Sequence, residues 1–408
     1  MSALEEVTRA GSAARAAHPG LAAAAAGALA DALDGMARGL RDRSDAVLTA
    51  NGLDVAAADG VLAPALVDRL RLDPERLERM SGQIAALAAL GDVEELVGSR
   101  ELAGGLVMRE RRRPVGVIGA NYEARPNVTV DVASQLIKSR NAGVLRTGAA
   151  ALRSAIALRD EVIAPAMERA GLDPDAIQLV RSPDRAAARA LVGLPHLIPL
   201  VILRGSGETT SALAREAAAN GVRTLAHAEG GGVLYIDVAA DRDRALALAE
   251  RSLDRLGVCN RLNLLLVARA LWDDLLPDVL ALLERLGIRA SLPPHAHPLG
   301  HEWALDDGNE ATVTVAPVAG PLEAARAAND ETSGLAAAIA TEDPDAAGLF
   351  LAAYTGTGAF WNATTRLLDG FELLGAPETG INVDHVPGPR GPVTFRDLHL
   401  RQYVVGPR

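Results

Sequence analysis

The sequence predicts an α/β protein of two domains, each built on a mostly parallel sheet. Strand-like and helix-like segments alternate from about residue 103 to 225, and a second alternating series begins near residue 230. Strands separated by helices form βαβ units, which give parallel sheets. With 408 residues, 49% of them hydrophobic, the chain is long enough for two cores. Because only 3% are aromatic, those cores must consist of Ala, Leu and Val.

The first hundred or so residues predict successive amphipathic helices. One start is marked by Asp73, Pro74 and Glu75, since an acidic N-cap followed by Pro and Glu is a typical helix beginning. No repeat of 20–50 residues is apparent in the chain.

The first alternating series follows these helices. Strands are expected at 106–110, 114–119, 143–146, 177–180, 200–203 and 222–225, and helices at 128–138, 154–170, 185–192 and 209–220. Parallel sheets bind ligands at the carboxyl ends of their strands, so the loops after these strands are the places to look for a site.

The second series predicts another sheet. Strands are expected at 233–237, 264–267, 312–316, 336–340 and 359–362, and helices at 243–253, 273–286, 321–329 and 344–354. The run 261–264 has a helix-like pattern, and the Pro- and His-rich segment 295–307 is expected to be a loop. Residues 388–392 predict a stiff turn that leads into an extended arm ending at Val405.

Cys259 is the only cysteine. A lone thiol cannot form an internal disulfide or supply a Cys-rich metal site. It can be a small buried hydrophobe or a nucleophile, and composition alone favours the first.

Charge and hydropathy exclude several classes of protein. The net charge of −11 argues against a nucleic-acid partner, and the basic run 109–113 is too short to change that. No apolar stretch is long enough to cross a bilayer, so no membrane partner is expected. The first residues lack a basic signal-peptide region, and with a single cysteine this predicts a cytoplasmic location.

Three loops are candidate binding segments. Residues 116–127 end a strand with Arg, Glu and Asn but lack the GxGxxG pattern. Residues 203–208 form a Gly-rich strand-to-helix turn that is suited to binding a phosphate. Residues 227–232 combine His, Glu and three Gly, which could bring the backbone close to a ligand. Each is also compatible with an ordinary capped loop or turn. The His-rich segment 294–301 has irregular spacing and is interrupted by Pro and Gly, so no metal site is expected.

Several of these segments together resemble one family. Residues 117–131 read VIGANYEARPNVTVD, 141–148 read NAGVLRTG, 257–260 read GVCN and 360–366 read FWNATTR. They are similar to the YEARPNVTVD, GNAVILRGG, GVCN and VNASTR motifs of glutamate-5-semialdehyde dehydrogenases (γ-glutamyl phosphate reductases), a branch of the aldehyde dehydrogenase superfamily. The resemblance runs through nearly the whole chain in the same order, and it implies an aldehyde-dehydrogenase-like fold.

The resemblance implies a reductive reaction at Cys259. The thiolate would attack the carbonyl of an acyl phosphate, favoured to be γ-glutamyl phosphate, and phosphate would leave to give a thioester. Hydride from NADPH would then give a thiohemiacetal that releases the aldehyde. This chemistry needs a thiolate in a partly exposed turn whose backbone amides can hold the oxyanion. An upstream kinase could deliver the unstable acyl phosphate.

The resemblance also implies residues for the cofactor. Arg146 stands where the superfamily has a Lys near the adenosine, and a permanently charged Arg suits the extra phosphate of NADPH. Gly205 and Ser206 would approach the cofactor phosphates. Glu229 is also expected to be a cofactor-binding residue.

Further residues are expected around the substrate. The candidates for its carboxylate and phosphate are Arg125, Thr365 and Arg366. Asn127 or Asn121 would add an oxyanion donor, and Asn362 would line the substrate site.

The family's architecture implies three parts and an oligomer. The cofactor-binding domain would span residues 1–228, the catalytic domain 229–385, and a C-terminal oligomerisation arm 386–408. Segments 102–113 and 394–405 would form the β-arm that pairs between subunits of a homodimer or homotetramer.

Departures from the family pattern keep other functions open. Residues 371–378 (FELLGAPE), 331–335 (ETSGL) and 231–237 (GGVLYID) replace family segments near the expected substrate. The chain could therefore be a paralogue that reduces another activated carboxylate in secondary metabolism, or an acyl-CoA reductase. Two rivals are an oxidative aldehyde dehydrogenase that hydrolyses its thioester with Glu229 as base, and a non-catalytic binding subunit.

Overall fold

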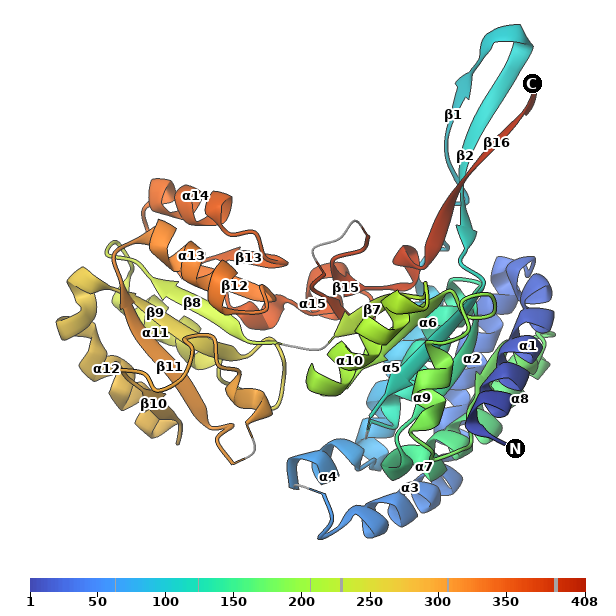
Figure 1. Ribbon diagram of the computed structural model, residues 1–408, viewed down its shortest axis with the longest axis horizontal. Helices are drawn as coiled ribbons and strands as arrows, with labels where there is room; N and C mark the ends of the chain where they lie inside the picture. Colours follow the sequence, from blue (N-terminus) through green and yellow to red (C-terminus); the bar gives the residue numbers. More distant parts are fainter. Residues whose placement is uncertain (63, 124, 206, 228–229, 307, 385–387) are drawn as a thin grey trace. The chain divides into compact units, whose positions relative to one another are not determined.

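The computed structural model describes residues 1–408 except 63, 124, 206, 228–229, 307 and 385–387 (Figure 1). The chain divides into two compact units. Unit 1 comprises Met1–Ala226, Gly375–Gly380 and Val393–Arg408, and unit 2 comprises His227–Leu374 and Ile381–Pro392. Each unit has its own sheet and core, and the predicted α/β fold with two parallel sheets is confirmed.

Unit 1 begins with the expected series of helices. They are α1 (Ala3–Ala22), α2 (Ala26–Asp42), α3 (Ser44–Ala58), α4 (Pro64–Leu70) and α5 (Pro74–Ala89). The predicted cap at Asp73 is confirmed, because its side chain accepts a hydrogen bond from the Arg76 N–H at the start of α5. Helices α2 and α5 pack on each other and on α6 (Asn127–Lys138).

A five-stranded sheet forms the centre of unit 1. Its order is β5-β4-β3-β6-β7, with β3 (Val117–Tyr122), β4 (Ala142–Thr147), β5 (Ile177–Leu179), β6 (Leu200–Arg204) and β7 (Arg223–His227). Helices α9 (Ala186–Leu191) and α10 (Gly207–Ala219) follow β5 and β6. The strand order reverses between β3 and β6, and such a reversal opens a binding crevice at the carboxyl ends of the strands.

The helix expected at 154–170 has three parts. They are α7 (Leu152–Ala157), a π-helical segment (Leu158–Ile163) and α8 (Ala164–Arg169). Pro165 has no N–H to donate into an α-helical turn, and a π turn accommodates the missing bond.

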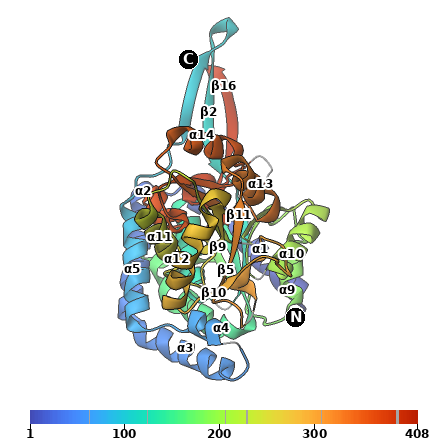
Figure 2. The same cartoon turned by 90° about the vertical axis from the view of Figure 1, so that its left-hand side faces the viewer.

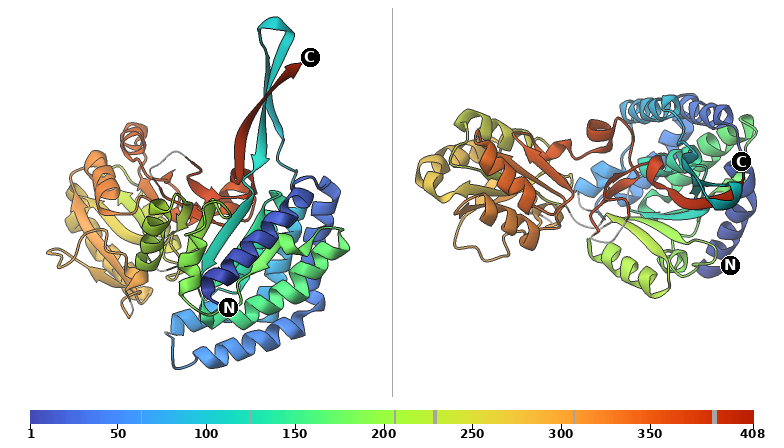
Figure 3. Two further views of the ribbon diagram at one scale, coloured as in Figure 1. Left: turned by 45° about the vertical axis from the view of Figure 1, so that its right-hand side comes forward. Right: turned by 90° about the horizontal axis from the view of Figure 1, so that it is seen from above.

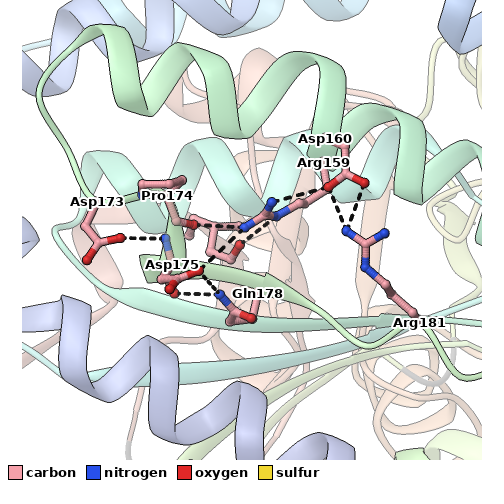
Figure 4. Close-up of polar contacts among 8 residues, drawn as sticks. Arg159, Asp160, Asp173, Pro174, Asp175, Gln178 and Arg181 are labelled. Carbon is pink, nitrogen blue, oxygen red and sulfur yellow. Dashed lines mark hydrogen bonds and ion pairs between the residues drawn. The ribbon is translucent and has the colours of Figure 1, made fainter.

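Ion pairs and hydrogen bonds join the π-helical segment to residues on either side of the edge strand β5 (Figure 4). Asp160 accepts two hydrogen bonds from one nitrogen of Arg181, at 2.7 and 2.8 Å. Arg159 donates to the Pro174 carbonyl at 3.3 Å, and Gln178 donates to the carbonyl and side chain of Asp175.

Unit 2 contains a six-stranded sheet of order β10-β11-β9-β8-β12-β13. The strands are β8 (Gly232–Ile236), β9 (Leu262–Ala268), β10 (Arg289–Ser291), β11 (Thr312–Val318), β12 (Ala336–Ala340) and β13 (Gly358–Trp361). All five pairings within it are parallel. The helices are α11 (Arg242–Arg251), α12 (Trp272–Arg285), α13 (Pro321–Glu331), α14 (Pro344–Ala353) and α15 (Gly370–Leu374).

Alternate residues of the unit 2 strands enter two different cores. Leu234 and Leu265 pack with α11 and α12, whereas Val233 and Leu264 pack with α13 and α14. The helices therefore cover both faces of the sheet (Figures 1 and 2). The expectation of a helix at 261–264 is wrong, because these residues begin β9 or lie just before it. A strand buried on both faces is apolar at nearly every position, so periodicity does not separate it from a buried helix.

A three-stranded antiparallel arm extends from the rest of unit 1 (Figure 3). It consists of β1 (Leu96–Glu101), β2 (Leu106–Pro114) and β16 (His399–Pro407). β1 contradicts the helical expectation for the first hundred residues, since all six of its residues are exposed and its conformation depends on pairing with β2. A short two-stranded sheet is formed by β14 (Gly380–Asn382) and β15 (Gly391–Val393). Among the described residues, no helix is long and apolar enough to span a membrane.

Candidate active site

Cys259 lies in a turn between α11 and β9 of unit 2 and is partly buried. It packs against an apolar cluster made of Leu335, Ala336, Leu368 and Ile381. The carbonyl oxygen of Cys259 accepts a hydrogen bond from the N–H of Gly231 at 2.7 Å. The thiol therefore belongs to a fixed, partly accessible turn, which is the setting that a cysteine nucleophile requires.

The Gly-rich loop approaches this turn closely. A Cβ atom on Gly230 would lie 2.5 Å from the Cys259 carbonyl oxygen and 2.7 Å from its Cα, so only glycine fits there. The backbone of Gly230 is held from two directions: its N–H donates to Glu302 Oε1 at 2.8 Å, and its carbonyl accepts from Ser333 Oγ at 2.9 Å. At Gly230 the backbone therefore lies directly against the cysteine turn.

The FWNATTR segment supports the residue that follows Cys259. Thr365 is fully buried, and its hydroxyl donates to the Asn260 carbonyl at 2.8 Å. The amide of Asn260 donates to the Leu368 carbonyl at 3.0 Å, and its oxygen accepts from Arg366. Arg366 also pairs with Asp254 at 2.7 Å. The structure thus brings Cys259, Thr365 and Arg366 together.

Asn362 is occupied by a different contact. It adopts φ +48° after β13, and its amide group donates to the Thr341 carbonyl at 2.9 Å and accepts from the Thr341 N–H at 3.0 Å. Both polar atoms of the side chain therefore stabilise the turn at Thr341.

Two polar residues on or beside β9 were missed by the sequence reasoning. Arg261 is 0% exposed and donates to the carbonyls of Leu262, Glu310 and Thr312. Burial lowers the pKa of Arg261 to about 10, with Glu302 and Glu310 opposing the shift. Asn263 is 2% exposed and bonds to the backbone of His301 and Trp303. Polar side chains within an otherwise apolar strand were the available signal, because a buried polar group needs a partner.

In unit 1, Arg146 lies near the carboxyl end of β4 and is 5% exposed. Its Nη1 donates to Asn121 Oδ1 at 3.1 Å, and its Nη2 donates to the Asp184 carbonyl at 3.2 Å. Within the described part of the chain its buried Nε has no hydrogen-bond partner. Burial lowers the pKa of Arg146, and the nearby Glu123 opposes this. An orphaned, buried guanidinium N–H at this position suits an anionic ligand.

Gly205 follows β6 and lies against Glu123. A Cβ atom on Gly205 would be 3.2 Å from the Glu123 carboxyl carbon and 3.3 Å from Thr210 Oγ1. The 13-residue helix α10 begins two residues later, so its N-terminal amides are close to this turn. Ser206 and Glu229 lie outside the described residues.

Asn127 and Arg125 stand at the beginning of α6. The Asn127 amide donates to Asp131 Oδ2 at 2.9 Å. Burial raises the pKa of Asp131 to about 6, and Arg204 together with the bond from Asn127 opposes this shift. Arg125 is half-buried in the loop before the helix, and its carbonyl accepts from the Val128 N–H at 3.1 Å.

The His-rich loop is held by aromatic and hydrogen-bond contacts. His297 lies 4.8 Å from the ring of Trp303 and 2.6 Å from Ser291 Oγ, and His301 bonds to Asp306 at 2.9 Å. Within the residues that the structure describes, no group of three or more His, Cys, Asp or Glu is arranged to hold a metal ion.

The chain is similar to known proteins over most of its length. A sequence model described as the aldehyde dehydrogenase family matches residues 1–298. The chain is 38% identical over 390 residues to γ-glutamyl phosphate reductase of Chloroflexus aurantiacus, covering 91% of each chain. It is 36% identical over 387 residues to the enzyme of that name from Caulobacter vibrioides, covering 92% of each. The crystal structure of γ-glutamyl phosphate reductase from Thermotoga maritima matches with a TM-score of 0.89 at 27% identity, over 98% of both chains.

Proposed function

We propose a function for this chain, which belongs to the aldehyde dehydrogenase family: the NADPH-dependent reduction of γ-glutamyl phosphate to glutamate-5-semialdehyde and phosphate, as in proline biosynthesis. The observation that carries this proposal is the supported turn of Cys259 in a chain 38% identical to a γ-glutamyl phosphate reductase over 91% of its length.

In this reaction Cys259 is the nucleophile. Its thiolate sulfur forms a bond to the acyl carbon, the bond from that carbon to the phosphate oxygen breaks, and inorganic phosphate leaves. The product is a thioester on Cys259. When bound, the nicotinamide cofactor would supply the hydride that reduces the thioester carbonyl. Cleavage of the carbon–sulfur bond would then release the aldehyde and return the Cys259 thiolate.

Two of the residues proposed to bind the cofactor, Arg146 and Gly205, lie in unit 1. Arg146 would bind a phosphate of NADPH, because its guanidinium keeps its charge and its buried Nε has no hydrogen-bond partner among the described residues. Gly205 would let the backbone approach the diphosphate in front of α10. Preference for NADPH over NADH follows from Arg146 in this proposal. Roles for Ser206 and Glu229 stay predictions.

Among the residues proposed for the substrate, the polar contacts separate supporting residues from binding residues. The Thr365 side chain is hydrogen-bonded to Asn260 and the Asn362 side chain to Thr341, so both act as supports. Arg125 and Arg366 are the cations for the substrate's carboxylate and phosphate. Asn127 would donate its second amide hydrogen to the oxyanion. A homodimer or homotetramer paired through the β1-β2-β16 arm, a cytoplasmic location and an upstream kinase stay predictions.

The reverse reaction tests the proposal. Purified protein is given glutamate-5-semialdehyde and NADP⁺ with and without inorganic phosphate, and reduced cofactor is followed by absorbance, with Cys259→Ser as the control. Reduction that depends on phosphate and disappears in the variant supports the proposal. Reduction without phosphate favours an oxidative, thioester-hydrolysing enzyme. Bound cofactor without turnover indicates a different activated carboxylate.

A further inference from the structure

We propose that Glu302 is a positioning residue that fixes the nucleophile turn by holding Gly230. This inference rests on the proposed role of Cys259. Glu302 lies 43 residues beyond Cys259 in the chain, in the long connection between β10 and β11. It is linked to the cysteine turn through the backbone of Gly230.

The contact is a hydrogen bond from backbone to carboxylate. The Gly230 N–H donates to Glu302 Oε1 at 2.8 Å. An ionised acceptor makes this type of bond stronger than one between neutral groups. Ser333 Oγ donates to the Gly230 carbonyl at 2.9 Å, so both polar groups of Gly230 are bonded to side chains from other loops.

A displacement of Gly230 would be transmitted to Cys259. The space that a Cβ on Gly230 would need is taken by the carbonyl oxygen, Cα and Cβ of Cys259, at 2.5 to 2.7 Å. The next residue, Gly231, donates its N–H to the Cys259 carbonyl at 2.7 Å. Because these atoms are in contact, the orientation of the thiol depends on where Glu302 holds the loop.

Glu302 is itself held on both sides. The buried Asn263 of β9 donates to the His301 carbonyl at 2.8 Å and accepts from the Trp303 N–H at 3.0 Å. The Trp303 ring nitrogen donates to Thr314 Oγ1 at 2.9 Å on β11. Residues 301–303 are therefore attached to two central strands, which makes Glu302 a fixed acceptor.

A second effect of Glu302 is electrostatic and can be separated from the first. Its carboxylate is one of two that favour the charged form of the buried Arg261. To stabilise the charged form of Arg261, Glu302 must keep its negative charge, but the length of its side chain can change. To hold Gly230, the side chain must be long enough to place an acceptor oxygen at the Gly230 N–H, but the acceptor need not be charged.

Three variants distinguish these effects. Glu302→Gln keeps the length and an acceptor oxygen but loses the charge. Glu302→Asp keeps the charge but is one methylene shorter, and Glu302→Ala loses both. Asp306→Asn is the matched control, because Asp306 lies in the same loop and bonds to His301 and Asn309.

Two readouts are used, and one does not depend on turnover. The hydrogen bond by which Glu302 holds Gly230 is called the clamp. Hydrogen exchange of the Gly230 and Gly231 amides measures the strength of this clamp directly in the full-length protein. In Glu302→Ala and Glu302→Asp we expect protection of both amides to fall about tenfold, the effect of one lost hydrogen bond. kcat should fall by a similar factor with KM changed less than about threefold, since the defect lies at the thiol. Glu302→Gln should stay within about threefold of wild type in both readouts while its Tm falls, and Asp306→Asn should leave both readouts unchanged.

The opposite pattern overturns the inference. If Glu302→Gln loses amide protection and kcat as strongly as Glu302→Ala, charge balance of Arg261 is the role of Glu302. If Glu302→Ala keeps full protection at Gly230 and Gly231, there is no clamp. If wild type is inactive on the acyl phosphate but the exchange pattern is as expected, the substrate proposal fails and the clamp stands.

Discussion

The hydroxyl of Thr365 donates to the carbonyl oxygen of Asn260 at 2.8 Å, so the segment after β13 supports the residue that directly follows Cys259. Thr365 is fully buried, and a Cβ on Gly232 would lie 2.6 Å from its hydroxyl oxygen. One threonine therefore contacts both the cysteine turn and the strand that follows the Gly-rich loop. Thr365, which the sequence predicts to bind substrate, is hydrogen-bonded to the cysteine turn in the structure.

Thr365→Val should weaken this support. The substitution keeps the side-chain shape but leaves the Asn260 carbonyl without its buried donor, at a cost of about 1–3 kcal/mol in unfolding free energy. Chemical denaturation measures the loss, and kcat should fall more than KM rises. Thr49→Val, on the exposed face of α3, is the control and should change stability by less than about 0.5 kcal/mol. Equal effects of the two substitutions would contradict the assignment.

Gly230→Ala should reduce activity severely. The added methyl would lie 2.5 Å from the Cys259 carbonyl oxygen, and backbone atoms on both sides must then move. We expect kcat to fall by at least about a hundredfold, as for other displacements of about 1 Å at reacting groups. Gly82→Ala in the exposed middle of α5, where nothing lies within 4 Å, should instead raise stability by about 0.5–1 kcal/mol. An active Gly230→Ala enzyme would show that the Gly-rich loop can move away without consequence.

Arg146→Ala should impair binding of NADPH more than that of NADH. The loss of a charge-assisted contact to the extra phosphate corresponds to about a 10–100-fold rise in the KM for NADPH. The ratio of KM values for the two cofactors is the measurement, with Arg38→Ala on the exposed face of α2 as the control. If the KM rises equally for NADPH and NADH, Arg146 contacts a group that the two cofactors share, and the proposed contact with the extra phosphate is wrong.

Asp131 should make stability fall as pH rises from about 4 to 6. Burial raises its folded-state pKa to about 6, above the ordinary 3.8, so in this window the folded state binds more protons than the unfolded state. The favourable contribution of the protonated carboxyl is full below about pH 4 and is lost as pH passes 6. Asp131→Asn should remove this dependence and be more stable than wild type at pH 7, by up to about 3 kcal/mol. Denaturation at pH 4, 5, 6 and 7 tests this, and parallel curves for the two proteins would contradict it.

The sequence predicted the elements whose patterns are local. The alternation of strands and helices reports burial on a sheet, and the cap at Asp73 is decided within four residues. Cys259 is the only cysteine in the sequence, but its catalytic role and the cofactor role of Arg146 are implied by the family resemblance. β1 could not be predicted in the same way, because its exposed residues become a strand only by pairing with β2.

The contacts around the thiol could not be predicted for a related reason. Glu302 lies 72 residues from Gly230, and Ser333 lies 103 residues from it. Such pairs are brought together by the sheet order of unit 2, which local patterns do not specify. Thr365 and Asn362 carry the right polar groups for a ligand, but their hydrogen bonds to Asn260 and Thr341 became apparent only in the fold.

Direct detection of the acyl-enzyme tests the central claim. The protein is incubated with glutamate-5-semialdehyde and NADP⁺ without phosphate, quenched in acid, digested and analysed by mass spectrometry. We predict a γ-glutamyl thioester on the peptide that contains Cys259, its loss when inorganic phosphate is added before quenching, and its absence in Cys259→Ser. Turnover without any adduct on Cys259, or turnover that survives in Cys259→Ser, would contradict the proposal that this thiol carries the reaction.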